Sequence, residues 1–489
     1  MSEMSTRLEK AFQNPLPEDA ADLDFDRDEM ARITDACMRY AIDHIHTLRD
    51  QPIVDMDGAV ELAATFDEPL PLKPQSIDEL ISRFGEGVEK TFNTAAPGYI
   101  AFIPGGGVYA ATLADYLSMS VNRYTGMWNA SPALIQIELA ALNWIRELIQ
   151  LPENFGGLFT SGGSISSLIA IITARRTRLP ENFLDGVIYL SKESHHCIPK
   201  SILLAGFPES RIRFIQTDKR LRMDVDALRA AVEADAAAGL CPFMVVANAG
   251  STNTGAVDPM PEISRICKDH EMWMHVDAAY GGFFRMVEGG EELLPGMELA
   301  DSVVLDPHKG LFLPYGTGCL LMRDPEELRR AHQSTADYMQ DLEHPTDAGV
   351  NFADISPELS RDFRGLRVWL PFKMHGVEAF RDNLREKLEL THWAYEEIKA
   401  LPDFECFDEP QLSIFAFRYL PKNEDANVFN QKLVERIKQK GRVFMTSTNI
   451  NGKFMIRIAI LSFRTHSIDL VNAIQDIKES VLELEADSG

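Results

Sequence analysis

The sequence lacks several features that would place it in a specialised class of protein. No stretch approaches the roughly 18 consecutive apolar residues of a membrane-spanning helix. Six cysteines are scattered through 489 residues without a CxxC pair, which argues against a disulfide framework and a zinc site. Positive charge is scarce, since 48 Lys and Arg against 74 Asp and Glu give a net charge of −26. We therefore expect no nucleic-acid partner, no membrane partner and no metal.

What remains is the composition of an ordinary globular protein. Hydrophobic residues make up 45% of the chain and charged residues 25%. The length allows two to four domains of about 100 to 200 residues each. The first ten residues, MSEMSTRLEK, are charged and lack the apolar core of a signal peptide, which predicts a cytoplasmic protein.

Hydrophobic periodicity divides the chain into three predicted regions. Residues 1–90 form an N-terminal helical arm, with apolar residues at helical spacing in residues 28–48. Residues 91–375 form a large α/β domain and residues 376–489 a smaller α+β domain. The large domain alternates helical segments with short runs rich in Val, Ile and Phe: GGLFT, GVIYLS, RIRFI, FMVVAN, MWMHVD and SVVLD. This alternation predicts a mostly parallel central sheet with helices on both faces.

The small domain is predicted from a change in the pattern of apolar residues along the chain. Residues 364–401 read as one long helical stretch, followed by the strand-like runs SIFAFRYL and FMIRIAIL.

Two of the predicted strands end in side chains that can take part in catalysis. SVVLDPHKG places His308 and Lys309 after one strand, and MHVDAAYGG places Asp277 at the end of the strand before it. Ligands of open α/β sheets bind at this edge. A lysine that forms a Schiff base and a carboxylate that keeps a pyridine nitrogen protonated suit pyridoxal phosphate. The alternative is a structural ion pair, but that would not require the small residues Ala278 and Ala279, which leave room for a flat ring.

Two further segments agree with such a cofactor. TSGGSISSL, residues 160–168, follows a strand and opens a helix, so its backbone N–H groups and the Ser164 hydroxyl could hold a phosphate. A Gly-Gly turn alone is weak support. In YLSKESHHCIPKS, either His195 or His196 could stack on the cofactor ring, although such a pair is more often polar surface.

The order and spacing of these motifs resemble the group II decarboxylases that depend on pyridoxal phosphate, a family of the fold-type I class. The resemblance spans nearly the whole chain, with matching segments PGYIAFIP, Ala130-Ser131-Pro132, TSGGS, the SxxxH spacing from Ser191, HVDAAYGG, DPHK, DFRGLRVW and IRIAILSFRTHSIDL. It implies decarboxylation of an L-amino acid to the amine and carbon dioxide, with an aromatic substrate favoured and an acidic one as the alternative. It also implies a homodimer with shared active sites and the arm wrapped on the partner.

The resemblance also implies a role for each site residue. Lys309 forms the Schiff base with the cofactor, His308 lies near the phosphate, Asp277 pairs with the pyridinium nitrogen, His195 stacks on the ring, Ala279 packs on the opposite face, Gly162, Gly163 and Ser164 hold the phosphate, and Asn248 lies near a ring substituent.

One departure from the family bears on the product. Relatives commonly carry a proton-donating tyrosine in a loop before the segment that reads here Phe363-Arg364-Gly365-Leu366-Arg367, and a count of eleven back from Phe363 reaches Phe352. A phenylalanine there favours the alternative outcome, oxidative deamination to an aldehyde. The count assumes no gap, and Tyr338 and His344 are other candidate donors.

The substrate side of the site is less defined. Phe102 and Pro104 are predicted pocket walls, and Arg123 either binds a second substrate carboxylate or has a structural or interface role.

Two more points concern the cofactor and the type of reaction. Asp306 stands where relatives have Asn near the phosphate, so we expect its carboxylate to point elsewhere. An aminotransferase or another fold-type I enzyme would share Asp277 and Lys309, and an aminotransferase would also need an arginine for the retained carboxylate, with Arg457 or Arg464 as candidates.

Overall fold

The structure is a computed structural model that describes residues 23–334 and 349–487. The described chain divides into two compact units. Unit 1 comprises residues 23–48 and 56–91, and unit 2 comprises the remaining described residues. None of the helices in these ranges is long and apolar enough to cross a membrane.

Unit 1 is a small helical unit. It contains α2 (Arg27–His46), α3 (Ala59–Ala64) and α4 (Ile77–Glu89), so the helix expected in residues 28–48 is confirmed. The Asp26 side chain accepts the Glu29 amide at 2.8 Å and starts α2, and Ser76 with Glu79 forms a capping box at α4. No residue of the three helices is buried within the described chain. The apolar residues of the unit are therefore only partly covered within the described chain.

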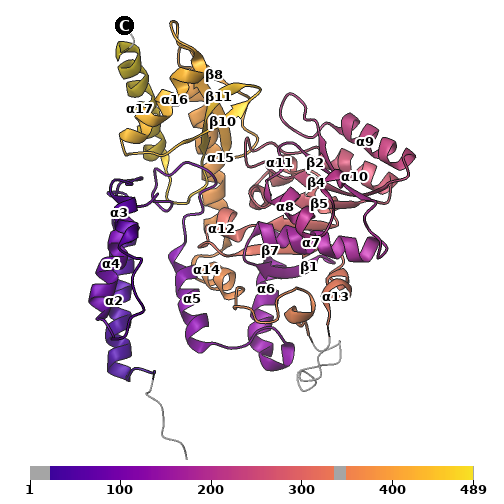
Figure 1. The fold of residues 1–489 in the computed structure, drawn as a ribbon, viewed down its shortest axis with the longest axis horizontal. Coiled ribbons are helices and arrows are strands. Elements are labelled where there is room, and N and C mark those ends of the chain that lie inside the picture. Colours follow the sequence, from indigo (N-terminus) through magenta and orange to yellow (C-terminus); the bar gives the residue numbers. More distant parts are fainter. Residues whose placement is uncertain (1–22, 335–348, 488–489) are drawn as a thin grey trace, which may run out of the picture. The chain divides into compact units, whose positions relative to one another are not determined.

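Unit 2 is built around a seven-stranded sheet with strand order β1-β7-β6-β5-β4-β2-β3 (Figure 1). The strands are β1 (Gly156–Thr160), β2 (Gly186–Ser191), β3 (Ile212–Ile215), β4 (Cys241–Asn248), β5 (Trp273–Asp277), β6 (Ser302–Leu305) and β7 (Gly318–Met322). Six of them are the runs predicted from the sequence. Because β7 alone runs antiparallel to its neighbours, the expectation of a mostly parallel sheet is confirmed.

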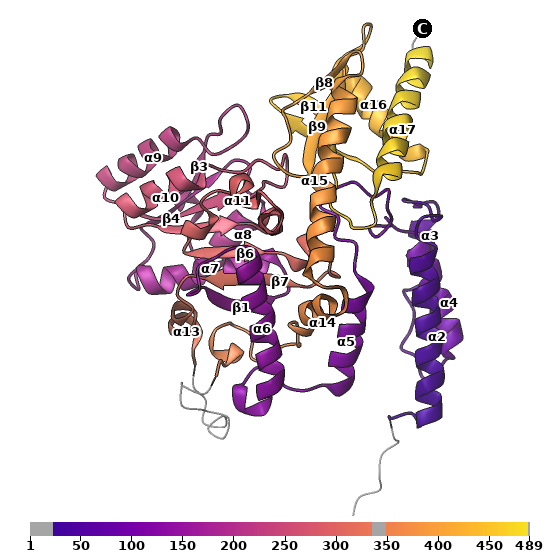
Figure 2. The same ribbon diagram turned by 180° about the vertical axis from the view of Figure 1, so that it is seen from behind.

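Helices cover both faces of this sheet (Figures 1 and 2). They are α5 (Tyr109–Val121), α6 (Pro132–Leu148), α7 (Gly163–Arg178), α8 (Cys197–Leu204), α9 (Val225–Ala237), α10 (Met260–Asp269), α11 (Gly290–Leu293), α12 (Pro307–Gly310), α13 (Glu326–His332) and α14 (Leu366–His375), with short 3-10 turns η1 (Trp128–Ala130), η2 (Glu209–Arg211), η3 (Gly282–Met286), η4 (Met297–Leu299) and η6 (Phe352–Asp354). The strands are almost entirely buried between them, which explains their continuous apolar sequences.

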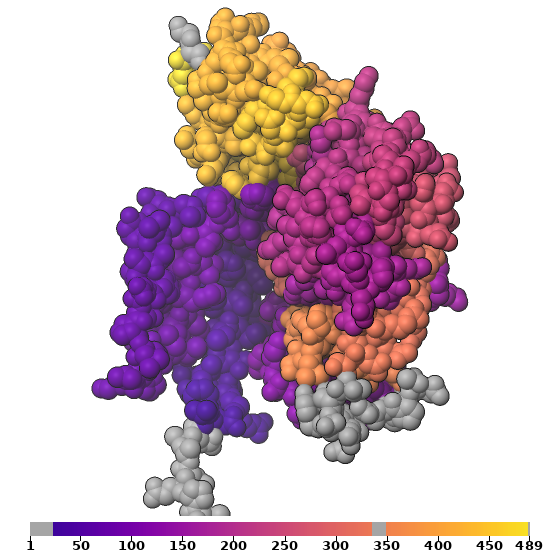
Figure 3. All heavy atoms as spheres, turned by 45° about the vertical axis from the view of Figure 1, so that its right-hand side comes forward, coloured from indigo at the N-terminus to yellow at the C-terminus, as the bar shows by residue number. Residues whose placement is uncertain are grey.

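A second lobe of unit 2 follows. It contains α15 (Val377–Lys399), β8 (Phe404–Cys406), β9 (Ile414–Tyr419), α16 (Ala426–Gln439), β10 (Thr446–Ile450), β11 (Lys453–Ala459) and α17 (Ser467–Asp487). Its four strands form an antiparallel sheet of order β10-β11-β9-β8. In the space-filling view its surface is orange to yellow, whereas the larger lobe runs from purple through magenta to orange (Figure 3).

The long helical stretch expected from residue 364 to residue 401 is wrong in one respect. Gly376, with a φ of +73°, separates α14 from α15, because only glycine adopts this conformation without strain. The first half of α15 packs Phe380 and Leu384 into the core of the larger lobe, and its second half packs Ala394 and Ile398 into that of the smaller lobe. The helix thus couples the two cores.

Candidate active site

The carboxyl ends of the parallel strands open onto a cavity of about 260 Å³. Nine residues predicted for the site line it: Gly162, Gly163, Ser164, His195, Asn248, Asp277, Ala279, His308 and Lys309. They come from segments that follow five different strands, which meet because parallel strands present the same ends to one edge of a sheet. Four residues that were not predicted from the sequence also line the cavity: Ser161, Gly250, Thr252 and Tyr280.

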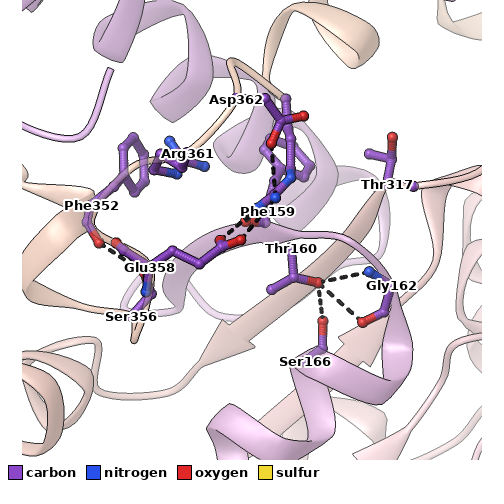
Figure 4. Close-up of polar contacts among 12 residues, drawn as sticks. Phe159, Thr160, Gly162, Ser166, Thr317, Phe352, Ser356, Glu358, Arg361 and Asp362 are labelled. Carbon is purple, nitrogen blue, oxygen red and sulfur yellow. Dashed lines mark hydrogen bonds and ion pairs between the residues drawn. The ribbon is translucent and has the colours of Figure 1, made fainter. Parts of the chain in front are cut away.

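The glycine-rich turn at one end of the cavity is the start of α7. The Thr160 hydroxyl accepts the Gly162 amide at 3.2 Å and lies 2.7 Å from the Ser166 hydroxyl, which fixes the turn (Figure 4). In the described structure no side chain caps this helix. A Cβ on Gly163 would lie 3.3 Å from the Ala279 methyl group and 3.1 Å from Asp306 Oδ2, so the turn approaches the cavity wall closely. Its first amides can bind an anion.

Lys309 lies on the short helix α12, three residues after Asp306. Its Nζ is 2.8 Å from Asp306 Oδ2, and His308 Nε2 is 3.6 Å from the same oxygen. Asp306 therefore faces the cavity, and the expectation that it points elsewhere is wrong. Burial lowers the pKa of Lys309, but the charges of Asp306 and Asp277 outweigh it and raise the pKa above the ordinary lysine value.

His308 is held from the other side of its ring. Its Nδ1 lies 2.7 Å from the Thr317 carbonyl oxygen, which fixes the ring's orientation. Burial lowers the pKa of His308, so the neutral imidazole is favoured.

Asp277 ends β5 with its side chain inside the protein. Its Oδ1 accepts the Ala279 amide at 3.2 Å. Burial raises the pKa of this carboxyl group, and the positive charge of Lys309 opposes the rise. A protonated ring nitrogen beside Asp277 would supply the partner that a buried carboxylate needs.

His195, rather than its neighbour His196, reaches the cavity. Burial, and next the charge of His196, lower the pKa of His195 to about 4, so the ring is neutral near pH 7. The amide of Cys197 donates to His195 Nδ1 at 3.2 Å, which places the hydrogen of the neutral ring on Nε2. A flat, neutral and oriented imidazole suits stacking on an aromatic ring.

Asn248 is oriented by a carboxylate that the sequence analysis did not single out. Its Nδ2 donates to Asp258 Oδ2 at 2.9 Å and to the Ser191 hydroxyl at 3.1 Å. Burial raises the pKa of Asp258 to about 6, although three N–H donors oppose the rise. A lone aspartate ten residues after Asn248 in a loop gives no local sequence signal.

The four predicted substrate residues do not line the cavity formed by the described residues. Phe102 is 59% exposed, Pro104 is buried, and Arg123 is exposed with its guanidinium donating to the Val121 carbonyl oxygen at 2.9 Å. Phe352 is completely buried beneath Arg361, whose guanidinium carbon lies 4.5 Å from the ring centroid. The other two candidate donors, Tyr338 and His344, lie outside the described residues.

The segment after Phe352 supports the site from behind. Arg364 donates to the Phe159 carbonyl oxygen at 3.3 Å and pairs with Glu358 at 2.7 Å. Phe159 directly precedes Thr160, so the DFRGLR motif anchors the strand that carries the glycine-rich turn.

Arg457 and Arg464, the candidates for binding a retained carboxylate, donate hydrogen bonds to backbone carbonyl oxygens. Arg457 donates to the carbonyl oxygens of Thr252, Asn253 and Phe102 at 2.6 to 2.9 Å. Arg464 donates to the carbonyl oxygens of Gly106 and Gly107. Neither arginine lines the cavity.

Strand β7 was not predicted, and it brings a glycine against the anion-binding turn. A Cβ on Gly318 would lie 2.5 Å from the Gly162 Cα atom and 2.6 Å from Thr160 Oγ1. We expect Gly318→Ala to displace the turn at a cost of about 1 to 3 kcal/mol, which corresponds to a cofactor Kd about 5- to 150-fold higher. Titration of the cofactor-free protein with pyridoxal phosphate measures the change. Gly87→Ala, whose Cβ would meet only Phe66 at 3.7 Å, is the control, and an unchanged Kd in Gly318→Ala would contradict the prediction.

The residues of the cavity fit pyridoxal phosphate. An anion site, a lysine amine, a buried carboxylate and a neutral histidine surround one space. No group of His, Cys, Asp and Glu in the described ranges could hold a metal ion.

Comparisons with known proteins agree with a pyridoxal-phosphate site. Residues 60–420 match the model of the pyridoxal-dependent decarboxylase conserved domain. The chain is 33% identical over 461 residues to an aromatic-L-amino-acid decarboxylase from Bacillus atrophaeus, covering 93% of this chain and 96% of that protein. It is 28% identical to a phenylacetaldehyde synthase from Petunia hybrida, covering 89% and 90% of the two chains.

Solved structures share the fold. A tryptophan decarboxylase from Catharanthus roseus in complex with L-tryptophan superposes with a TM-score of 0.86 at 26% identity, covering 94% of this chain and 99% of that chain. The structure of Oryza sativa TDC with PLP and tryptamine gives 0.90 at 24% identity, covering 95% and 100%. The family match over more than half of the sequence shows that this chain belongs to the pyridoxal-dependent decarboxylases, enzymes whose cofactor is pyridoxal 5′-phosphate.

Proposed function

We propose that the protein removes the α-carboxylate of an L-amino acid, aromatic in preference to acidic, and releases the amine and carbon dioxide. The observation that carries the proposal is that Lys309 and Asp277 line one cavity together with the open start of α7. The aromatic preference is supported by the relatives, which include aromatic-L-amino-acid decarboxylases of Bacillus atrophaeus and Catharanthus roseus.

When bound, pyridoxal phosphate supplies an aldehyde that accepts an amine and a protonated ring that accepts electrons from a bond at the substrate Cα. In this proposal Lys309 holds the cofactor through Nζ until the substrate amine replaces it. Asp277 keeps a proton on the ring nitrogen, because a buried carboxylate next to a cation favours the charged pair. His308 lies beside the phosphate.

The remaining cavity residues would fix the position of the cofactor. Gly162, Gly163 and Ser164 bind the phosphate through backbone N–H groups and one hydroxyl. His195 stacks on one face of the ring and Ala279 packs on the other. Asn248, oriented by Asp258, hydrogen-bonds the ring substituent.

Loss of the carboxylate, rather than its retention, is supported by the arginines. An enzyme that keeps the carboxylate needs a cation to bind it, and Arg457 and Arg464 are committed to backbone carbonyl oxygens. The roles of Phe102, Pro104 and Arg123 in substrate binding stay predictions.

The alternative product, an aldehyde, rested on Phe352 in place of a proton donor. Phe352 is buried beneath Arg361 and does not line the cavity, so this residue no longer supports the aldehyde, and we keep the amine as the proposed product. Relatives of both kinds exist, since the matches include the Petunia hybrida phenylacetaldehyde synthase.

Simultaneous measurement of carbon dioxide release and oxygen uptake tests the proposal. The cofactor-loaded protein is supplied with aromatic, acidic and basic L-amino acids in turn. Carbon dioxide without oxygen uptake is the expected result for an aromatic substrate. Matched oxygen uptake would establish the aldehyde-forming alternative, and no carbon dioxide from any amino acid would overturn the decarboxylase assignment.

We also propose a cytoplasmic homodimer with shared active sites. Each chain of the proposed dimer comprises the arm of residues 1–90, a cofactor-binding domain of residues 91–375 and a small domain of residues 376–489. The support for the dimer is the apolar surface left exposed on α5, where Leu117, Met119 and Val121 are each about half exposed. Light scattering of the holoenzyme should give twice the mass of the chain, and a monomer would contradict the dimer.

A further inference from the structure

Asp306 forms the ion pair of the proposed cofactor lysine. Its Oδ2 lies 2.8 Å from Lys309 Nζ, and its side chain is only 3% exposed. The backbone holds the two residues in place, because the Asp306 amide donates to the Ala279 carbonyl oxygen at 3.2 Å and its own carbonyl oxygen accepts the Lys309 amide at 2.8 Å. The second carboxylate oxygen, Oδ1, has no hydrogen-bond partner among the described residues.

Other titratable groups face this pair. Asp277 and Cys197 face Lys309, and His308, His195 and Cys319 face Asp306. Of the charged groups in this set, Asp306 is the one within ion-pair distance of Lys309 Nζ. The cysteines do not add charge, since burial raises the pKa of Cys197 to about 12 and that of Cys319 further.

We propose that Asp306 is a positioning residue that binds the Lys309 ammonium whenever this nitrogen is not bonded to the cofactor, so that release of Lys309 from Asp306 limits cofactor loading. The inference rests on the proposed role of Lys309.

The ion pair between Asp306 and Lys309 slows cofactor loading, and the chemistry of Schiff-base formation explains why. An ammonium has no lone pair, so Lys309 Nζ must first give a proton to solvent and leave the carboxylate. The free amine then attacks the aldehyde carbon, the carbonyl oxygen leaves as water, and a C=N bond replaces the C=O bond. Because Asp306 stabilises the charged form of Lys309, it lowers the fraction of reactive amine at neutral pH. The same contact keeps Lys309 Nζ inside the cavity, where this nitrogen can bond to the cofactor again.

The phosphate site requires care in the design of a test. The Asp306 carboxylate lies about 3 Å from the position of a Cβ on Gly163, so it also repels a bound phosphate. Pyridoxal, which has the aldehyde but no phosphate, separates the two effects. Its rate of imine formation with the cofactor-free protein reports the availability of the Lys309 amine alone.

The experiment follows this rate by visible absorbance between about pH 6 and pH 12 for the wild type, Asp306→Asn and Asp301→Asn. Asp301 is the matched control, since it precedes the same strand β6 at its other end and accepts the Met274 amide at 2.8 Å. We expect the midpoint for Asp306→Asn to move down by about one pH unit, with loading near pH 7 about tenfold faster. Asp301→Asn should match the wild type.

Two results would overturn the proposal: an Asp306→Asn profile that coincides with that of the wild type, or one displaced to higher pH. The Lys309→Ala variant distinguishes failure of the Asp306 proposal from failure of the proposed function. Unchanged imine formation in Lys309→Ala would show that Lys309 does not bond to the cofactor. Should Asp306→Asn not fold, Asp306→Glu and the wild type suffice. Asp306→Glu should keep the wild-type midpoint. Competitive labelling of Lys309 in the wild type should give a midpoint above the ordinary lysine value of about 10.4, and one below it would contradict the proposal.

Discussion

Replacement of Lys309 with alanine is expected to abolish the visible absorbance of the bound cofactor and to lower the rate of carbon dioxide release on the order of 10³-fold or more. In the proposed function the residue supplies the amine that holds the cofactor, and the described cavity contains no other lysine. Absorbance spectra and radiometric carbon dioxide release measure the two effects independently. Lys200→Ala, at an exposed lysine on α8, should retain both. A variant that keeps both signals would show that another amine carries the cofactor.

Loss of Lys309 also leaves the Asp306 carboxylate buried without its ion-pair partner. Removing one member of a buried pair costs about 3 kcal/mol, so Lys309→Ala should unfold at lower denaturant concentration. The double variant Lys309→Ala/Asp306→Asn should recover most of that stability and none of the activity. This pair of results distinguishes a chemical role of the lysine from a structural one.

Replacement of Asp277 with asparagine is expected to leave the cofactor bound and to stop turnover. The amine of Lys309 and the start of α7 remain, so absorbance should show a loaded site. The neutral amide no longer favours a proton on the ring nitrogen, and we expect carbon dioxide release to fall about 10²- to 10⁴-fold.

The control for Asp277→Asn is again Asp301→Asn, a half-buried carboxylate at the opposite edge of the sheet. It should release carbon dioxide at the wild-type rate. Full activity in Asp277→Asn would show that the ring nitrogen does not depend on this carboxylate. Failure of the variant to load cofactor would instead assign Asp277 to binding rather than to chemistry.

Local sequence predicted the site residues that directly follow buried strands. Asp277, His195 and Lys309 each come within a few residues of an apolar run, and the strand direction alone brings them to one edge. The signal is strong because a doubly covered parallel strand needs uninterrupted apolar residues, whereas the polar residue that ends it must have a reason to be there.

Elements whose neighbours come from distant parts of the chain were harder to predict. Strand β7 has only five residues and lies between β1 and β6, so its pairing depends on chain segments up to about 160 residues away. The four-residue helix α12 and the turn at Gly376 likewise have no long periodic pattern. Short elements are stabilised mainly by tertiary contacts, which sequence periodicity does not record.

Side-chain direction was the other limit. Asp306 and Phe352 were interpreted from their positions in a motif, yet the first faces Lys309 and the second lies in the core beneath Arg361. A count along a loop cannot say which residue reaches a site, because loop length varies without affecting the strands around it.

The α/β class, the strands that carry the site, and the lysine, carboxylate and glycine-rich turn that suit pyridoxal phosphate could all be predicted from the sequence. Each of these depends on local patterns of apolar residues and on the side chains next to them. Four other facts became visible in the folded chain alone: Asp306 pairs with Lys309, Asp258 orients Asn248, Gly318 packs against the glycine-rich turn, and Phe352 is buried. These facts depend on which distant residues pack together, and packing is settled by the free energy of the whole fold.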